Sequence, residues 1–223
     1  DGDILAMICD STNVFNDYES GSEATVRESL RRIVSQQTGR VAVTAFASNV
    51  ARIASIVEAG HACGRRVVLV GRSINRNVEV ARLCGYLKDL PPLVSVEEAS
   101  YLAPEQTLLV CTGSQGEPRG AMSRIANDKH PNIRLEPDDT VIFSSKIIPG
   151  NELTLAGLFN VLAKKGVRVI TEKEAFVHVS GHPGRKELTQ MYQWIRPKIS
   201  IPVHGEARHL AEHARLAEKL QIP

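Results

Sequence analysis

The chain has 223 residues, enough to bury the core of one large domain or two small ones. Hydrophobic residues make up 43% and charged residues 23%, which is ordinary for a globular protein, and no apolar run reaches the ~20 residues that a membrane-spanning helix needs. The formal net charge of +2 neither requires nor excludes a nucleic-acid partner, because a local basic groove can lie in a near-neutral protein.

The four cysteines are scattered along the chain without a CxxC pair; they are Cys9, Cys63, Cys84 and Cys111. Most lie in apolar stretches, which favours buried free thiols in a reducing cytoplasm over disulfides or zinc ligands. The chain opens at Asp1 and enters the apolar stretch DILAMIC almost at once. We therefore interpret it as a fragment of a longer cytoplasmic protein.

Apolar, strand-like runs alternate with helical patterns roughly every 25 to 30 residues, the spacing of β–α–β units. The expected strands are, in chain order, residues 3–9, 40–46, 66–70, 107–111, 140–144, 167–171 and 199–203. The expected helices are residues 23–34, 49–62, 153–165 and 207–220. Several strands are continuous apolar runs, as expected of parallel strands covered on both faces. The pattern predicts an α/β fold with a mainly parallel sheet flanked by helices.

Polar and ionisable residues follow almost every expected strand. The segments are CDSTN at 9–13, ASN at 47–49, GRS at 71–73, TGSQGEP at 112–118, IPGNE at 148–152, HVSGH at 178–182 and HGE at 204–206. Ligands of open parallel sheets bind beyond the carboxyl ends of the strands, so this edge is the expected site. Ser and Asn at these positions are also the usual N-caps of a following helix, and a cap and a phosphate site are compatible. No P-loop and no GxGxxG fingerprint occurs, which disfavours an ATPase or a dehydrogenase.

Five of the seven histidines lie near the C-terminus: His178, His182, His204, His209 and His213. The last two are four residues apart on an expected helix rich in Ala, Glu and Arg. We interpret them as a solvated face rather than a metal-binding pair. In contrast, His182 and His204 each stand beside a glycine at the polar edge, where imidazole can bind a divalent metal or act as an acid or base.

The segments CDSTN, FASNVAR, GRS, TGSQGEP, IPGNE, HVSGH and PVHGEARHL resemble, in this order, the RNase J family of metallo-β-lactamase-fold ribonucleases with a β-CASP insert. The resemblance covers essentially the whole chain. It implies that residues 1–13 end the N-terminal part of the metallo-β-lactamase domain, that 14–160 form the β-CASP domain, and that 161–223 form the C-terminal part of the metallo-β-lactamase domain.

The resemblance also implies roles for individual residues. Asp10 and His182 match two motifs of the catalytic site, and His204 matches a ligand of one of two active-site metal ions, zinc or manganese. The residues that match loops holding the nucleotide and its phosphate are Ser48, Asn49, His178, Ser180 and Gly181. An acid such as Asp10 within reach of His182 would orient its ring and raise its basicity. Further candidates for RNA backbone contacts, with solvated surface positions as the alternative, are Arg52, Arg72, Arg119, Lys146 and Arg185.

Two departures limit what the resemblance transfers. The family's HxHxDH metal signature is absent from the chain, so that only His204 of the metal ligands is present. Ala51 stands where many relatives have a histidine after FASNV, so a contact made by that histidine is not carried over. We therefore expect the chain by itself to have no nuclease activity and no tight metal site.

The leading hypothesis is part of a metal-dependent ribonuclease that degrades single-stranded RNA from 5′ to 3′, also cuts internally, and works in cytoplasmic RNA decay and maturation as a homo-oligomer without a membrane. Two alternatives remain. One is a non-catalytic RNA-binding or scaffold module of the β-CASP type, and the other is a β-CASP nuclease acting on DNA.

Overall fold

The computed structural model describes residues 3–223 of the chain. The chain forms two compact units: a smaller one made of Asp1–Gly21 and Val179–Pro223, and a larger one made of Ser22–His178. Both ends of the chain therefore contribute to the smaller unit, while the middle forms the larger one.

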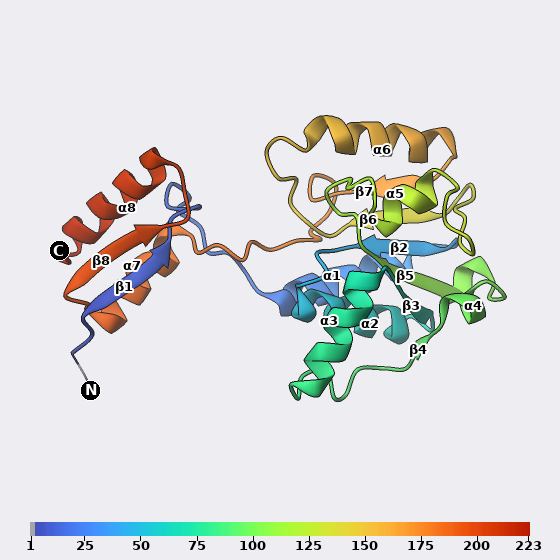
Figure 1. Ribbon diagram of the computed structural model, residues 1–223, viewed down its shortest axis with the longest axis horizontal. Coiled ribbons are helices and arrows are strands. Elements are labelled where there is room, and N and C mark those ends of the chain that lie inside the picture. Colours follow the sequence, from blue (N-terminus) through green and yellow to red (C-terminus); the bar gives the residue numbers. More distant parts are fainter. Residues whose placement is uncertain (1–2) are drawn as a thin grey trace. The chain divides into compact units, whose positions relative to one another are not determined.

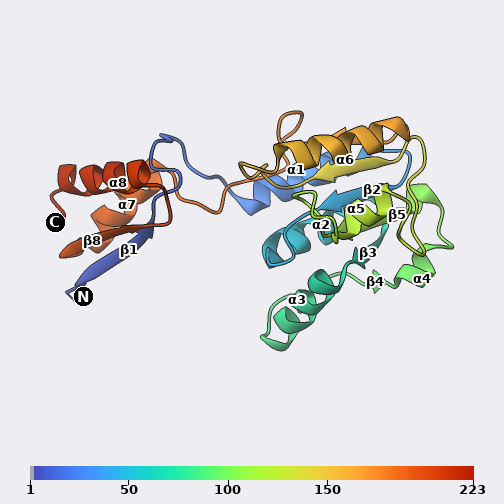
Figure 2. The ribbon, with the colours of Figure 1, turned by 45° about the horizontal axis from the view of Figure 1, so that its top comes forward.

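The larger unit is built on a parallel sheet of six strands (Figures 1 and 2). Its strands are β2 (Val41–Thr44), β3 (Arg66–Val70), β4 (Leu93–Val94), β5 (Thr107–Cys111), β6 (Thr140–Phe143) and β7 (Arg168–Ile170). They lie in the order β4-β3-β5-β2-β6-β7, and every neighbouring pair is parallel. All residues of β2, β5 and β6 are buried, which explains why these strands are continuous apolar runs rather than alternating patterns.

Helices cover both faces of this sheet. They are α1 (Glu23–Ser35), α2 (Val50–Ala62), α3 (Arg72–Leu83), α4 (Val96–Ala99), α5 (Ala121–Ala126) and α6 (Glu152–Lys164), with a short 3-10 turn, η1 (Pro104–Gln106). Figure 1 shows α1, α2 and α3 on one face and α5 and α6 on the other. Side-chain caps fix where two of them begin: the Ser22 hydroxyl accepts from the N–H of Ala24, and the side-chain Oδ1 atom of Asn49 accepts from the N–H of Arg52.

The smaller unit has two parallel strands, β1 (Ala6–Asp10) and β8 (Ile199–Val203), and two helices, α7 (Arg185–Ile195) and α8 (Ala207–Lys219). Met7 of β1 packs with Tyr192, Ala217 and Ile222 in a small core. Because side chains alternate along a strand, every second side chain of β1 and β8 points away from this core. Ile8, Ile199, Ile201 and Val203 are accordingly exposed.

The predicted fold class is confirmed: both sheets are parallel and helices flank them. The strands expected at 66–70, 107–111 and 199–203 have the predicted limits, and the others are shorter by one to three residues or shifted along the chain. Three helices were not predicted, namely α3, α5 and α7, nor were the short elements β4 and α4.

The two compact units divide the chain at other places than the expected domain boundaries at 13/14 and 160/161. The strand β7 follows residue 160 but pairs with β6, so it completes the sheet of the larger unit. Val14 packs against Leu188 and Leu216, within the smaller unit. Residues 1 and 2 of the first expected domain lie outside the described residues.

All four cysteines are free, as expected, but only Cys111 is fully buried. Cys84 is exposed, and Cys9 and Cys63 are half-buried, so the expectation of mostly buried thiols is wrong. Among the described residues, no helix is both long enough and apolar enough to cross a membrane.

Candidate active site

The pairing of β1 with β8 brings an acid and a histidine to the same edge of the smaller unit. Asp10 is the last residue of β1 and pairs with Val203, the last residue of β8. His204 follows directly, with a φ of +55°, in the left-handed region that non-glycine residues rarely adopt. The turn that begins there leads through Gly205 into α8, so His204 stays beside the end of β1.

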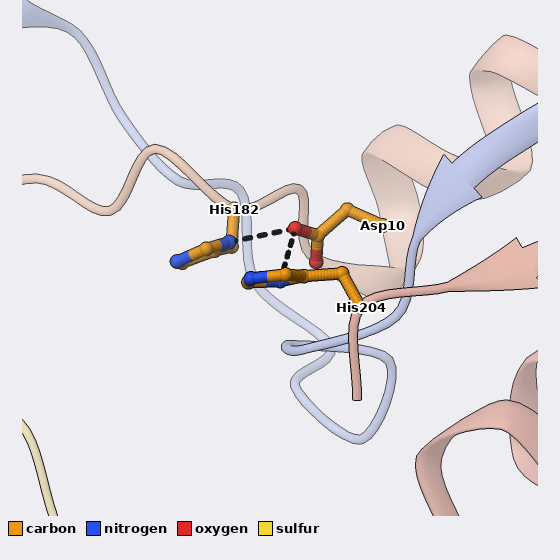
Figure 3. A group of neighbouring side chains, drawn as sticks. All are labelled: Asp10, His182 and His204. Atoms are coloured by element: carbon orange, nitrogen blue, oxygen red, sulfur yellow. Dashed lines mark hydrogen bonds and ion pairs between the residues drawn. The ribbon is translucent and has the colours of Figure 1, made fainter. Parts of the chain in front are cut away.

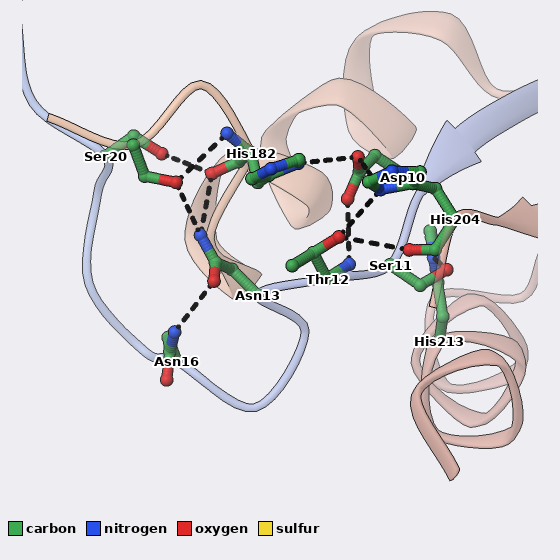
Figure 4. A network of polar contacts seen from close by, with 10 residues as sticks. Asp10, Ser11, Thr12, Asn13, Asn16, Ser20, His182, His204 and His213 are labelled. Atoms are coloured by element: carbon green, nitrogen blue, oxygen red, sulfur yellow. Dashed lines mark hydrogen bonds and ion pairs between the residues drawn. The ribbon is translucent and has the colours of Figure 1, made fainter. Parts of the chain in front are cut away.

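His182 reaches the same place from the loop before α7. A single parallel bridge joins the backbones of Asn13 and Gly184, so this loop runs beside the segment that follows β1. The Asn13 amide donates to the Ser180 hydroxyl and to the His182 carbonyl, both at 3.0 Å. The Ser20 hydroxyl donates to the same carbonyl at 2.7 Å (Figure 4). The backbone at His182 is therefore held from two directions.

Asp10, His182 and His204 form a compact group, called here the Asp10 cluster (Figure 3). The Asp10 Oδ2 atom lies 2.8 Å from Nδ1 of His182 and 2.8 Å from Nδ1 of His204. The two imidazole rings stack with centroids 5.1 Å apart. The structure thus brings together the three residues for which the resemblance implied catalytic or metal-binding roles.

Thr12 completes the hydrogen bonding of the Asp10 cluster. Its N–H donates to Oδ1 of Asp10 at 2.8 Å, and its hydroxyl donates to the His204 carbonyl at 3.1 Å. The same hydroxyl oxygen lies 2.9 Å from Nδ1 of His204. Since a hydroxyl has one proton, the oxygen accepts at this second contact, and Nδ1 of His204 is the donor.

Electrostatics favours an ionised Asp10. Partial burial alone would raise the pKa of this carboxyl, but hydrogen bonds from the Thr12 N–H and from His182 outweigh it, and the net pKa is lowered. An ionised carboxylate only accepts hydrogen bonds, so Nδ1 of both His182 and His204 carries a proton. In a neutral imidazole this leaves the lone pair on Nε2, free for a metal ion or a proton.

The Asp10 cluster is accessible and has the donor atoms that divalent metals take. Side-chain exposure is 26% for Asp10, 42% for His182 and 65% for His204. Each side chain offers one ligand atom, and these atoms lie within 4.8 Å of one another. Imidazole nitrogen suits zinc and manganese, so the outward Nε2 atom of His204 fits one ligand position of a divalent ion.

A buried chain of hydrogen bonds lies behind the segment that follows Asp10. The Ser11 hydroxyl lies 2.8 Å from Nδ1 of His213, and Nε2 of His213 lies 2.8 Å from the Tyr192 hydroxyl. His213 is fully buried, so its interpretation as part of a solvated face is wrong. Burial lowers the pKa of His213, with a smaller opposing effect of Asp10. His209 is half-buried and packs edge-on against Phe15, with ring centroids 5.5 Å apart.

The predicted phosphate-binding residues are divided between the two units. In the smaller unit, the Ser180 hydroxyl accepts from the His182 N–H, and exposed Gly181 has no atom within 4 Å of where a Cβ would stand. In the larger unit, Ser48 is exposed and Asn49 caps α2. His178, also in the larger unit, has its Nδ1 atom 3.4 Å from an Arg52 nitrogen.

Arg52 is not a surface residue, which overturns its place among the candidates for RNA contacts. It is 1% exposed, and its Nε and Nη2 atoms form a bidentate pair with Glu23 at 2.8 Å each. Its Nη1 atom donates to the carbonyls of Ser144 and Val177. Arg52 therefore fixes the start of α2, which carries Asn49, to the end of β6 and to the segment before His178.

The other basic candidates differ from one another. Arg185 is 21% exposed in its side chain and is paired with Glu212 at 2.8 Å, so it is largely committed to holding α7 against α8. Arg72, Arg119 and Lys146 are exposed and stay candidates.

Comparisons with known proteins agree with this description. A family model described as "Ribonuclease J, beta-CASP domain" matches residues 38–162. A second model, described as "Zn-dependent metallo-hydrolase RNA specificity domain", matches residues 166–223. The chain is 47% identical over 220 residues to a ribonuclease J of Sinorhizobium meliloti, covering 99% of the chain and 39% of the relative. It is 43% identical over 224 residues to a ribonuclease J of Mycolicibacterium smegmatis, covering 100% of the chain and 40% of the relative.

A more distant relative gives the same result. A ribonuclease J of Helicobacter pylori is 35% identical over 222 residues, covering 99% of the chain and 32% of the relative. The chain thus spans about a third to two fifths of the length of these curated relatives. With a β-CASP match over more than half of its residues, followed by the metallo-hydrolase match, the chain belongs to the ribonuclease J family.

Proposed function

We propose that the chain supplies part of the active site of a metal-dependent ribonuclease that cuts the phosphodiester bonds of single-stranded RNA. The observation that carries this proposal is the Asp10 cluster, in which one ionised carboxylate lies 2.8 Å from Nδ1 of each of two accessible histidines. The family membership and the RNA specificity domain matched at residues 166–223 support RNA as the substrate. We propose degradation from 5′ to 3′ with additional internal cuts.

The residues of the Asp10 cluster have different roles in this proposal. Asp10 accepts the hydrogen bond of Nδ1–H of His182 and so aims its Nε2 atom outward. After Nε2 has taken up a proton, the imidazolium can donate that proton to the leaving oxygen or a hydrogen bond to the scissile phosphate. Asp10 and Thr12 hold the ring of His204 in the same way. With its Nδ1 atom occupied, His204 offers Nε2 as a metal ligand.

His204 would hold one of two divalent ions, zinc or manganese, with the remaining ligands outside the matched motifs of this chain. When bound, such ions activate water and neutralise the charge that develops on the phosphate. Because catalytic zinc sites use three protein ligands, we propose that the chain by itself binds metal weakly and does not cut RNA.

RNA contacts are proposed for both units: Ser180 and Gly181 in the smaller, and Ser48, Asn49 and His178 in the larger. Hydroxyl, amide and backbone N–H groups bind phosphate without reading the base, which suits degradation without sequence preference. We also propose that the protein acts in the cytoplasm as a homo-oligomer.

The test is cleavage of 5′-phosphorylated single-stranded RNA and of matched DNA with added Zn²⁺ or Mn²⁺. It is run on the full-length protein, on this chain by itself and on single variants. We expect His182→Ala to lower the cleavage rate about a hundredfold to ten-thousandfold, the range for loss of a general acid or base. His204→Ala should act mainly through metal affinity, and added metal should restore part of its rate.

His61→Ala is the matched control, because His61 is an exposed histidine of α2 in the larger unit, outside the Asp10 cluster. Its rate should stay within about twofold of the parent, since a surface substitution away from the site has little effect. RNA binding without any cleavage by the full-length protein would favour a scaffold module. Equal cleavage of DNA and RNA would favour a nuclease that does not need the 2′-hydroxyl.

A further inference from the structure

The larger unit has a basic cavity at the carboxyl ends of β3 and β5, called here the arginine cavity. Its volume is about 1120 Å³, and its walls include Arg72 and Arg76 of α3, Arg119 in the segment before α5, and Arg124 of α5. None of these residues belongs to the Asp10 cluster or to the predicted phosphate-binding loops. The proposed cleavage chemistry therefore leaves the arginine cavity unexplained.

The sheet topology makes this place a natural ligand site. The chain leaves β3 toward β4, on one side, and leaves β5 toward β6, on the other side, although β3 and β5 are neighbours. The connecting helices α3 and α5 therefore lie on opposite faces of the sheet (Figure 1) and leave a crevice between the two strand ends. Open parallel sheets bind ligands at such places, where neighbouring strands lead to helices on opposite faces.

The sheet has a second crevice of this kind, between the ends of the neighbouring strands β2 and β6. The chain leaves β2 toward β3 and leaves β6 toward β7, again in opposite directions. Ser48 and Asn49 follow β2 there and are already proposed to contact RNA. By the same topological rule, the crevice between β3 and β5 should hold a ligand of its own.

Charge indicates what kind of ligand this is. Four arginines line the arginine cavity, against two carboxylates, Glu79 and Glu97. Within residues 3–223, the side chains of Arg72, Arg76 and Arg119 form neither an ion pair nor a hydrogen bond, and Arg124 donates only to a backbone carbonyl. Several arginines without a carboxylate partner in the described part of the chain line one cavity. Such a site favours an anion with several oxygens, and the planar guanidinium group matches phosphate.

At the floor of the arginine cavity, the turn between β3 and α3 packs closely against Thr112, which follows β5. Gly71 has a φ of +131°, and a Cβ at this position would lie 2.7 Å from Oγ1 of Thr112. The helix α3 begins directly after Gly71 and has no side-chain cap, so the N–H groups of its first turn are open to an incoming anion. These groups add to Arg72 on the same turn and to Arg76 on the next turn of α3.

We propose that the arginine cavity binds the phosphate backbone of single-stranded RNA, as a second contact region of the ribonuclease proposed above. Its volume exceeds the ~300–1000 Å³ of ordinary small-molecule sites, so more than one nucleotide fits. Among residues 3–223, no Phe, Tyr or Trp lines it, so contacts with phosphate should dominate over stacking on bases, and binding should depend little on base sequence.

The test is the salt dependence of RNA binding, measured by fluorescence anisotropy with a labelled single-stranded RNA in EDTA, so that cleavage plays no part. The variant is the double substitution Arg72→Gln and Arg119→Gln. Each phosphate contact on a single strand contributes about 0.7 to the slope of log affinity against log salt. We expect the slope to fall by about 1.4 and the affinity at low salt to fall about tenfold or more.

The control is the double substitution Arg32→Gln and Arg66→Gln, which removes the same charge from exposed positions of the larger unit outside the arginine cavity. Its slope should stay within about 0.3 of the parent, because charges outside the contact region release few counterions. Circular dichroism of both variants checks that the fold is kept. If the two double variants bind RNA equally well, the proposal is overturned.

Two measurements distinguish this proposal from a free-nucleotide site and from the proposed cleavage function. The first is calorimetry with 5′-AMP on the double variant Arg72→Gln and Arg119→Gln, called here the cavity variant. If the cavity variant loses AMP binding while its RNA binding is unchanged, the ligand is a free nucleotide and the proposal is overturned. The second is the salt slope itself: a lower slope in the cavity variant supports the RNA contact even where the full-length protein cuts no RNA, so the two proposals fail separately.

Discussion

The two units of the chain differ in how completely their parallel sheets are covered. In the larger unit, helices cover both faces of six strands, and β2, β5 and β6 are buried throughout. In the smaller unit, the helices α7 and α8 accompany only two strands, whose outward residues Ile8, Ile199, Ile201 and Val203 are exposed. Two strands by themselves are marginal in water, so the smaller unit has less burial to stabilise it.

The Asp10 cluster nevertheless belongs to the smaller unit. Asp10, His182 and His204 come from three segments that the smaller unit joins by the β1–β8 pairing, the Asn13 bridge and the buried His213 network. Hydrogen bonds among polar side chains therefore order this site where apolar burial is scarce. We therefore expect substitutions of polar residues to lower the stability of the unit that contains them, by amounts that differ between the two units.

The largest effect on folding is expected in the larger unit, from Arg52→Ala. The substitution leaves Glu23 without its bidentate partner and the carbonyls of Ser144 and Val177 without a donor. Breaking a buried ion pair costs about 3 to 5 kcal/mol, and we expect the lower end, about 3 kcal/mol, because the Glu23 side chain is 32% exposed. Urea unfolding measures it. Arg32→Ala, at an exposed position, should change stability by less than about 0.5 kcal/mol.

The second prediction compares the two sheets directly. Amide hydrogens of β2 and β5 should exchange more slowly than those of β1 and β8, by on the order of a hundredfold, since a sheet buried on both faces opens less often. Hydrogen exchange followed by mass spectrometry or NMR gives both values in one experiment. Equal protection of the two sheets would contradict the comparison.

The third prediction concerns the buried network of the smaller unit. Tyr192→Phe removes the partner of Nε2 of His213 and should cost about 1 to 2 kcal/mol, the penalty for a buried polar group left unpaired. Unfolding followed by the signal of Trp194, which lies on α7, reports on this unit. A cost near zero would show that His213 finds another partner.

The same histidine predicts how stability depends on pH. Burial lowers the folded-state pKa of His213 below its ordinary value of 6.5, so the unfolded chain binds the proton first. The smaller unit should therefore lose stability as the pH falls below about 6.5, down to the folded pKa. Asp10, whose pKa is lowered, loses its contribution only at more acidic pH. Urea midpoints between pH 5 and 8 check this, and His213→Gln should flatten the profile.

The smallest effect is expected at Asn49, which caps α2. Asn49→Ala should cost about 1 kcal/mol of stability, and Asn49→Asp should keep most of it, because a carboxylate also caps a helix. If Asn49 contacts RNA, Asn49→Asp should still weaken RNA binding by charge repulsion with phosphate. A variant that keeps both stability and RNA affinity would leave Asn49 as a cap alone.

The sequence predicted best what depends on local pattern. The strands at 66–70 and 107–111 are apolar runs bounded by polar residues, and the structure has them with the same limits. The helix α7 was not predicted, although Leu188, Met191, Tyr192 and Ile195 stand at the i, i+3, i+4 and i+7 spacing of an amphipathic helix. The helical period was therefore present in the sequence, even though only Leu188 and Tyr192 of this stripe are fully buried.

What the sequence could not predict depends on partners that are distant in the chain. His213 looks solvated among Ala, Glu and Arg, but Ser11 is 202 residues away and completes its hydrogen bonding. Arg52 looks like a surface residue until Glu23 and the carbonyls beyond β6 surround it. The Asp10 cluster was anticipated through motif resemblance. The contacts that order it follow only from the fold: those of Thr12 from the pairing of β1 with β8, and those of Asn13 from its bridge with Gly184.

The most direct test of the central claim is the protonation of the two histidines beside Asp10. With ¹⁵N-labelled histidine, NMR at pH 8 distinguishes a proton on Nδ1 from one on Nε2. We predict Nδ1–H for both His182 and His204, with Asp10→Asn shifting at least one ring toward the other form. Rings with the proton on Nε2 in the unaltered chain would contradict the claim that Asp10 orients both histidines for catalysis.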